Sequence, residues 1–265
     1  MEPGRWARAC APLLQPVLLA LFGLTALSSC SKQGPRGSLI AVPAYFQAGP
    51  PWRALNEAAP AVGMAIVNPS NGTGATPEPG LVQAVGEARA SGLVVLGYVA
   101  TGYGRRPVAE VVAEIDRYRQ WYEVGGVFLD EASSSCTDLA YYSTVSDQAK
   151  AGGAPFTIVL NPGNETAECF MGVADVIVTF EGDHEAYVTR YRAPDWVAGY
   201  TAARFWHLIY GTPTVPQMQR AVRLARSRGV GWIYVTPDSL PNPWGRLPDG
   251  PYWEAQLAAV QKRGA

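Results

Sequence analysis

The stretch GGVFLDEASSSC, residues Gly125 to Cys136, places two carboxylates directly after an apolar run. Residues 127–129 are Val, Phe and Leu, a composition typical of a buried strand. Asp130 and Glu131 follow where that strand would end. Because only 16% of the chain is charged, adjacent acids at the edge of the core indicate a functional site.

Apolar runs of this kind recur along the chain, with helical patterns between them. The predicted strands are Leu39–Tyr45, Ala61–Asn68, Leu93–Ala100, Gly125–Asp130, Phe156–Asn161, Ala174–Glu181, Arg204–Tyr210 and Val230–Thr236. The predicted helices are Glu78–Ser91, Arg106–Trp121, Thr137–Ala151, Val215–Arg228 and Tyr252–Lys262, with weaker helical patterns at Trp52–Ala59 and His184–Tyr191. Strands that alternate with helices predict a parallel sheet with crossover connections. The expected fold is α/β, a single (β/α)8 TIM-type barrel over residues 39–265.

The length of the chain agrees with this fold. A (β/α)8 barrel takes about 250 residues, and the whole sequence has 265. An open doubly wound sheet is the alternative. Its GxGxxG phosphate-binding pattern is missing after the first strand, where residues 42–52 read VPAYFQAGPPW.

Most of the predicted strands end in a polar side chain. Successive strand residues point to opposite faces, so we expect Glu181 to share a face with Thr179 and Ile177, and Asp130 to share one with Phe128. The same count selects six further residues: Tyr45, Asn68, Tyr98, Asn161, His207 and Tyr234. In a barrel these side chains would face the axis at the C-terminal rim, where such barrels carry their active sites. We expect the six to bind substrate.

The acids at this rim suit the hydrolysis of a glycosidic bond. One carboxylic acid protonates the leaving oxygen, and a second carboxylate attacks the anomeric carbon or activates water. Carboxylates crowded in a partly dry site raise the pKa of one of them, which keeps it protonated near neutral pH. The candidate catalytic residues are Asp130, Glu131 and Glu181. Their structural alternative is a salt bridge or a helix N-cap, a role open to Glu131 because a helix is predicted soon after it.

Other chemistries find little support. The sequence contains no GxSxG, no Walker loop and no HExxH motif. Its two His, His184 and His207, and its four Cys do not fall in a metal-ligand spacing. We therefore expect neither a metal nor a cofactor. A net charge of −1 without a basic block argues against nucleic acid as a partner.

The first 29 residues have the pattern of a secretory signal. Two arginines precede an apolar run over residues 11–27, and small residues then lead into Cys30. This order resembles a bacterial lipobox, where cleavage leaves a lipidated Cys30. We expect a lipoprotein signal peptide over residues 1–29, a short tether over residues 30–38, and a protein anchored outside the cytoplasm in the bacterial cell envelope. An ordinary secretory signal is the alternative.

Cleavage of the signal and lipidation of Cys30 would leave two thiols, Cys136 and Cys169. Outside the cytoplasm such a pair is usually oxidised. The two residues follow the fourth and fifth predicted strands, which are neighbours in a barrel. We therefore expect a disulfide between them on the catalytic side.

The chain contains, in this order, the motifs VPAYFQAGPPW, AIVNPSNGTG, VLGYVATGYG, GGVFLDEA, LNPG and VIVTFEG. As a set they resemble the spherulin 4-like family, glycoside hydrolase family 135, over residues 40–261. The resemblance implies a (β/α)8 barrel that acts on α-1,4-linked N-acetylgalactosamine in galactosaminogalactan-type polysaccharides. It also implies that Asp130, Glu131 and the Glu of TFEG, Glu181, are the acids needed for activity. Tyr45, Asn68, Tyr98 and Asn161 fall inside its motifs and resemble cleft residues.

The expected protein is thus a lipid-anchored monomer that hydrolyses an amino-sugar polysaccharide and meets the membrane only through its anchor. A non-catalytic surface lipoprotein that binds glycan on the same barrel is the alternative. The presence of all three acids disfavours it, because a decayed enzyme tends to lose at least one.

Replacement of Cys30 tests the anchor. Cys30→Ala removes the site of lipidation, so the protein should move from the membrane fraction to the soluble or secreted fraction of the cells. Cys10→Ala, inside the predicted signal, is the control and should leave the distribution unchanged. A Cys30 variant that stays firmly membrane-bound would contradict the lipobox interpretation.

Overall fold

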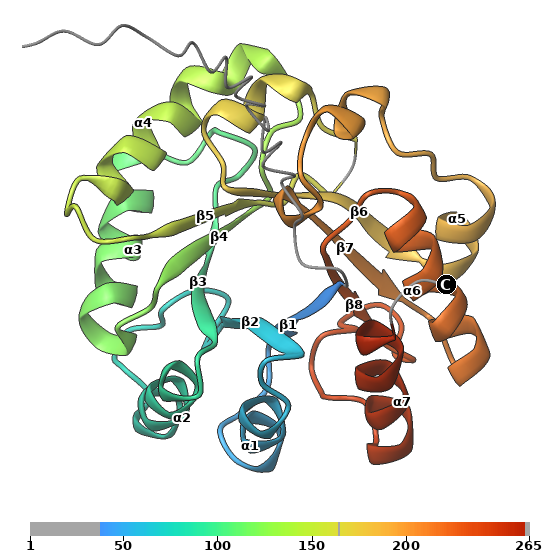
Figure 1. Ribbon diagram of the computed structural model, residues 1–265. Helices are drawn as coiled ribbons and strands as arrows, with labels where there is room; N and C mark the ends of the chain where they lie inside the picture. Colours follow the sequence, from blue (N-terminus) through green and yellow to red (C-terminus); the bar gives the residue numbers. More distant parts are fainter. Residues whose placement is uncertain (1–37, 164, 263–265) are drawn as a thin grey trace, which may run out of the picture. The chain divides into compact units, whose positions relative to one another are not determined.

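The computed structural model describes residues 38–163 and 165–262. Eight parallel strands close into a barrel in chain order, with the eighth paired to the first. They are β1 (Leu39–Ala44), β2 (Val62–Val67), β3 (Val94–Ala100), β4 (Gly126–Asp130), β5 (Thr157–Leu160), β6 (Val176–Asp183), β7 (Phe205–Tyr210) and β8 (Trp232–Val235). Figure 1 shows the helices around the outside of the strands. The predicted fold is confirmed, while the predicted signal peptide and Cys30 lie outside the described residues.

The predicted helices are present, including the two weaker ones. They are α1 (Pro50–Glu57), α2 (Pro79–Ala90), α3 (Val108–Tyr122), α4 (Leu139–Lys150), α5 (His184–Thr189), α6 (Val215–Ser227) and α7 (Gly250–Gln261). Side chains of Asp183, Thr214 and Asp249 cap α5, α6 and α7 by accepting a backbone N–H of the first turn. Between β5 and β6 the described residues form a 3-10 helix, Glu168–Gly172. Within the described residues, no helix has the length and apolar character needed to span a membrane.

Aromatic side chains fill the barrel beneath its C-terminal rim. The ring of Phe128 on β4 lies 5.6 Å from Trp206 on β7 and 6.5 Å from Tyr98 on β3, between ring centroids. All three side chains are buried. Full burial of such a side chain contributes about 1.5–3 kcal/mol to folding. This packed apolar layer closes the barrel beneath the rim.

Helix α3 packs unusually close to β3. A Cβ atom built on Gly97 would lie 2.4 Å from the ring of Tyr118, a distance that no side chain tolerates. Glycine at this position lets the helix approach, and the buried Tyr118 ring takes the space. The strand that carries Tyr98 is thereby fixed against its helix.

A β-bulge in β6 changes which of its residues face the axis. The register between β6 and β7 shifts at Thr179, which is the extra residue. Its hydroxyl lies 3.1 Å from Nε2 of His207, on the helix side of the sheet. Beyond the bulge, Glu181 pairs with Leu208 and faces the axis. The expectation that Thr179 and Ile177 share the face of Glu181 is wrong, because the bulge interrupts the alternation.

Cys136 and Cys169 form the disulfide expected from the sequence, with their Cα atoms 6.1 Å apart. Cys136 opens a 3-10 helix, Cys136–Asp138, in the loop after β4, and Cys169 lies in the 3-10 helix between β5 and β6. The bond therefore ties together the segments that follow two neighbouring strands.

Loss of this disulfide should destabilise the barrel. The two cysteines are 33 residues apart in sequence, and the chain-entropy model assigns a loop of that size about 3–4 kcal/mol. Denaturant unfolding of the double variant Cys136→Ser/Cys169→Ser should show a loss of that order, and reduction of the parent should match it. An unfolding free energy equal to that of the oxidised parent would contradict a stabilising role.

Candidate active site

The two adjacent acids of the β4 stretch point to different places. Asp130 ends β4 at the rim, whereas Glu131 has a left-handed backbone with φ of 48° and is exposed. The carbonyl of Glu131 accepts hydrogen bonds from the Tyr103 N–H at 2.6 Å and the Thr101 hydroxyl at 2.8 Å. A left-handed conformation in a non-glycine residue is strained and is common at functional sites. As a result of this turn, the Asp130 carboxylate lies in the barrel mouth and the Glu131 carboxylate lies on the rim.

Asn161 joins the two inner carboxylates. Its Nδ2 donates to Oδ1 of Asp130 at 2.8 Å and to Oε2 of Glu181 at 2.6 Å. The Tyr98 hydroxyl donates to the other oxygen of Asp130, Oδ2, at 2.8 Å. Tyr45 meets the Tyr98 ring edge-on, with the centroids 5.6 Å apart. The structure thus brings together five of the predicted site residues, carried by or directly after β1, β3, β4, β5 and β6.

The pKa values of both inner carboxylates are raised. At Asp130 burial raises the pKa, while hydrogen bonds from Tyr98 and Asn161 oppose the rise. At Glu181 burial again raises the pKa and the hydrogen bond from Asn161 opposes it, but the charge of Asp130 adds to the increase. Charge repulsion of this kind lets one acid ionise and keeps its neighbour protonated. Of the two, only Asp130 has hydrogen bonds from both Tyr98 and Asn161 that favour its ionised form.

Two connected hollows open the network to solvent. The first, of about 310 Å³, is lined by Tyr103, Asp130, Glu131, Asn161, Glu181, Tyr210 and Leu240, together with Pro162 and Gly163. The second, of about 430 Å³, is lined by Tyr45, Asn68, Asn71, Glu181 and residues 240–244. Glu181 and Leu240 line both, so the hollows form one groove over the carboxylates.

Asn68 lies in the second hollow, as its place at the end of β2 predicted. Its Oδ1 accepts the N–H of Gly72 at 2.8 Å, which folds the following loop back onto the strand end. Asn71 in that loop has a positive φ of 51° and also lines the hollow. The side chain of Asn68 therefore shapes the groove wall as well as facing it.

His207 and Tyr234 do not line the groove, and the expectation that they contact substrate does not hold in this structure. Both are 0% exposed. On β7 the axis side is taken by Trp206, so His207 faces α5, where its Nδ1 lies 2.8 Å from the Tyr187 hydroxyl. Tyr234 pairs with Leu208, two register pairs beyond Trp206 and on the same side of the sheet. Trp244 covers it, with 5.9 Å between the ring centroids.

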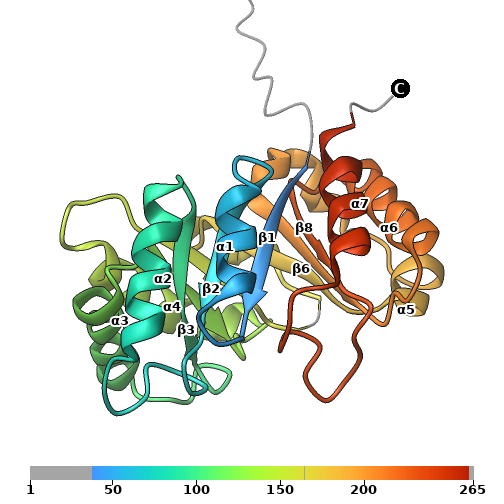
Figure 2. The same ribbon diagram turned by 90° about the horizontal axis from the view of Figure 1, so that it is seen from below.

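The long loop from β8 to α7 supplies groove residues that sequence reasoning missed. It carries Trp244, which lines the same hollow as Glu181, and Leu240, which is 66% exposed. Figure 2 shows this loop extending beyond the barrel at the end where β1 terminates. The loop has no helix or strand period, so pattern analysis passed over it. The available signal was its length, because long loops at this end of a barrel are commonly functional.

No metal site accompanies these acids in the part of the chain that the structure describes. Within residues 38–163 and 165–262, no group of three or more His, Cys, Asp or Glu side chains is placed to hold a metal ion.

The spherulation-specific family 4 matches residues 39–260, almost the entire barrel. The chain belongs to this family. Over 147 residues it is 34% identical to Spherulin-4 of Physarum polycephalum, a match that covers 54% of this chain and 44% of that relative. The match thus spans less than half the length of the curated family member.

Solved structures share the fold. Sph3 of Aspergillus clavatus, determined in complex with GalNAc, matches with a TM-score of 0.73 and 22% identity, over 84% of this chain and 97% of Sph3. A chitinase of Chromobacterium violaceum matches with a TM-score of 0.54 and 12% identity, over 86% of this chain and all of the chitinase chain (100%). At these identities the likenesses establish the barrel.

The raised carboxyl pKa of Glu181 predicts how stability depends on pH. Between its ordinary value of 4.5 and its raised value, the folded protein binds more protons than the unfolded chain. The free energy of unfolding contributed by Glu181 therefore falls as pH rises through that window. Glu181→Gln removes this titration, so at pH 7 the variant should be at least as stable as the parent.

Denaturant unfolding at pH 4 and pH 7 measures this effect. The advantage of Glu181→Gln over the parent should shrink at the lower pH, because both proteins are then uncharged at this position. Glu254→Gln, on the exposed face of α7, is the control and should follow the parent. A Glu181 variant much less stable than the parent at pH 7 would show that the carboxylate is a structural ion-pair partner.

Proposed function

We propose that this protein is a glycoside hydrolase that cleaves α-linked, N-acetylgalactosamine-containing polysaccharide within the chain of the polymer. The observation that carries the proposal is the pair of carboxylates, Asp130 and Glu181, held by one amide nitrogen at the base of an open groove. Two carboxyl groups flanking a bond are the equipment of most glycosidases. The likeness to Sph3, whose structure contains GalNAc, supports the choice of sugar.

The environments of the two acids suggest their roles. Asp130 receives hydrogen bonds on both oxygens, from Tyr98 and Asn161, which favours its ionised form. It therefore acts as the nucleophile at the anomeric carbon. Glu181 has its pKa raised by burial and by Asp130, so it holds the proton that the leaving oxygen needs.

The reaction then follows in two steps. Asp130 forms a bond to the anomeric carbon as the glycosidic bond breaks, and Glu181 gives its proton to the departing oxygen. Glu181, now a carboxylate, takes a proton from water, and that water displaces Asp130 from the sugar. Glu181 ends reprotonated and Asp130 ends ionised, as they began.

The spacing of the acids supports this two-step route. Their bridging oxygens lie 2.8 Å and 2.6 Å from the same nitrogen, so they are no farther apart than these two hydrogen bonds laid end to end. Retaining glycosidases place their carboxyl groups about 5–5.5 Å apart, whereas inverting ones need about 6.5–9.5 Å to admit a water. We therefore expect the product to keep the anomeric configuration of the substrate.

The rim supports action on a polymer. Tyr103 and Leu240, 49% and 66% exposed, stand at the edge of the groove, where apolar surface can contact sugar rings. Glu131 lies in the same hollow and can hydrogen-bond a sugar near the reacting bond. The lipobox-like sequence before Cys30 supports attachment to the bacterial cell envelope by a lipid, outside the cytoplasm.

Removal of single carboxylates tests the mechanism. Loss of a general acid or base typically costs about 100–10,000-fold in rate. Asp130→Asn and Glu181→Gln should therefore each fold normally and lose at least about 100-fold of turnover on α-1,4-linked N-acetylgalactosamine oligosaccharides. Glu131→Gln should be impaired to a smaller degree, because its carboxylate lies outside the bridged pair. Product release is followed by chromatography of the oligosaccharides.

Asp147→Asn and Glu254→Gln, exposed on α4 and α7, are the matched controls and should keep the activity of the parent. Wild-type turnover by Glu181→Gln would contradict the two-carboxylate mechanism. A parent that binds the oligosaccharides without cleaving them would instead support a glycan-binding lipoprotein.

A further inference from the structure

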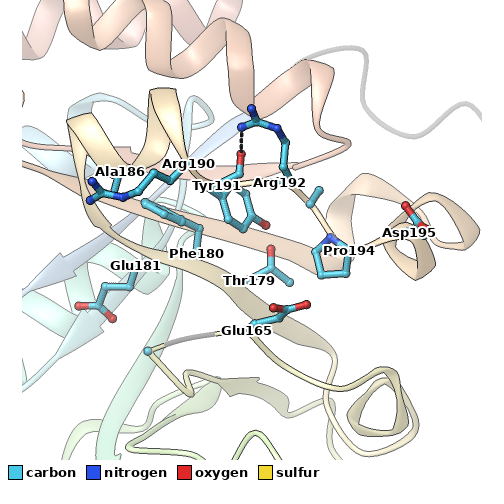
Figure 3. Close-up of a pocket in the computed structure, with 12 residues that line it drawn as sticks. Glu165, Thr179, Phe180, Glu181, Ala186, Arg190, Tyr191, Arg192, Pro194 and Asp195 are labelled. Atoms are coloured by element: carbon cyan, nitrogen blue, oxygen red, sulfur yellow. Dashed lines mark hydrogen bonds between the residues drawn. The ribbon is translucent and has the colours of Figure 1, made fainter.

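A third cavity, larger than the two hollows described above, lies against the end of β6. Its volume is about 670 Å³, and its walls are residues 163, 165, 179–181, 186 and 190–195. Cavities of about 300–1,000 Å³ bury ligands of drug size. Figure 3 shows Glu181 at one side of this space and Asp195 at the other, with Phe180 and Tyr191 between them.

This cavity continues the groove. It shares Glu181 and Gly163 with the hollow that contains Asp130. On its other side, that central hollow shares Glu181 and Leu240 with the hollow beneath Trp244. Glu181 lines all three spaces, so they adjoin one another around this carboxylate. A polymer that passes over Glu181 can therefore place its reacting bond there and further sugar units in the adjoining spaces.

The lining of the cavity suits a sugar chain. Phe180 and Tyr191 form an aromatic floor with ring centroids 4.7 Å apart, and both rings are partly exposed. Arg190 and Glu165 are exposed charged groups on its walls, and Figure 3 places Arg190 on the side of Glu181. Aromatic surface with a few polar groups is the usual composition of a small-molecule site.

The bulge in β6 explains why the cavity borders the catalytic acid. Because Thr179 is the extra residue, Phe180 turns toward α5 while Glu181 turns toward the axis. Phe180 then packs against Tyr187 at 4.8 Å and Tyr191 at 4.7 Å between ring centroids. One strand end thus supplies the floor of the cavity and the catalytic acid beside it.

We propose that this cavity is a remote subsite that binds sugar units of the polysaccharide beyond the bond being cleaved, with Arg190 as its polar contact and the Phe180–Tyr191 floor beneath the rings. The inference rests on the proposed function and adds a binding site to it. Contacts with remote sugars supply binding energy that can be used at the reacting bond, so short substrates react more slowly.

Substrates of two lengths test the subsite. An α-1,4-linked N-acetylgalactosamine trisaccharide is too short to fill both flanking spaces at once, whereas an octasaccharide can extend into them. The parent should show a higher kcat/KM on the octasaccharide. Arg190→Ala removes a charged hydrogen-bond donor to a remote sugar, so it should lower the octasaccharide-to-trisaccharide ratio of kcat/KM about tenfold or more.

A second variant fills the space instead of removing a contact. Ala193 lines the cavity on the segment after α5, so Ala193→Trp should lower the same ratio by obstruction. Arg223→Ala, an exposed arginine on the neighbouring helix α6, is the matched control and should leave the ratio unchanged. Circular dichroism and thermal unfolding establish that each variant is folded.

The outcomes separate the two proposals. A parent that cleaves neither oligosaccharide refutes the proposed function, and the subsite with it. If the parent cleaves both but Arg190→Ala and Ala193→Trp keep the parental ratio, only the subsite is refuted. Equal losses on both lengths would place these residues at the reacting sugar and would also overturn a remote subsite.

Discussion

The amide of Asn161 is the constraint on which the site depends. One nitrogen hydrogen-bonds two carboxylates, Asp130 and Glu181, that would repel each other if both were ionised in a partly dry space. Asn161 is 4% exposed, and its backbone continues the β4–β5 ladder through a 2.9 Å hydrogen bond to the carbonyl of Leu129. A slip of one residue in that register would turn the amide toward the helices. The strand register that closes the barrel between β4 and β5 therefore also places the amide that holds the two acids.

Further contacts around the rim hold Asp130, Asn161 and Glu181 in place. The Phe128 and Trp206 rings close the barrel beneath the acids, so their carboxylates meet little water from below. The disulfide joins the segments that follow β4 and β5. Asp130 is the last residue of β4, and Asn161 directly follows β5. Burial raises the pKa of both acids, which opposes ionisation and costs stability near neutral pH. In the proposed mechanism the same burial keeps a proton on Glu181 for the leaving oxygen, at a cost in stability.

The features that could be predicted from the sequence are those that follow from the periodicity of its strands and helices. Alternation of strands and helices predicted the barrel, and strand parity selected Asp130, Asn161 and Glu181, each at the end of a predicted strand. Parity failed for His207, since β7 runs on to Tyr210 and the imidazole lies too deep and on the helix side. The bulge at Thr179 leaves no periodic signal either. Trp244 comes from a loop without regular structure, and its place against Tyr234 depends on tertiary packing that no local pattern encodes.

These differences divide the groove into two kinds of surface. The two inner carboxylates lie at the rim ends of strands, whose positions are fixed by hydrogen bonds between neighbouring strands and by the packed barrel interior. The flanks come from connections, the β8–α7 loop with Leu240 on one side and the segment after α5 with Arg190 on the other. Loops change more readily than strands without loss of the core. On the proposed function, recognition of the polymer and cleavage of its bond are therefore carried by separate parts of the fold, the connections and the strand ends.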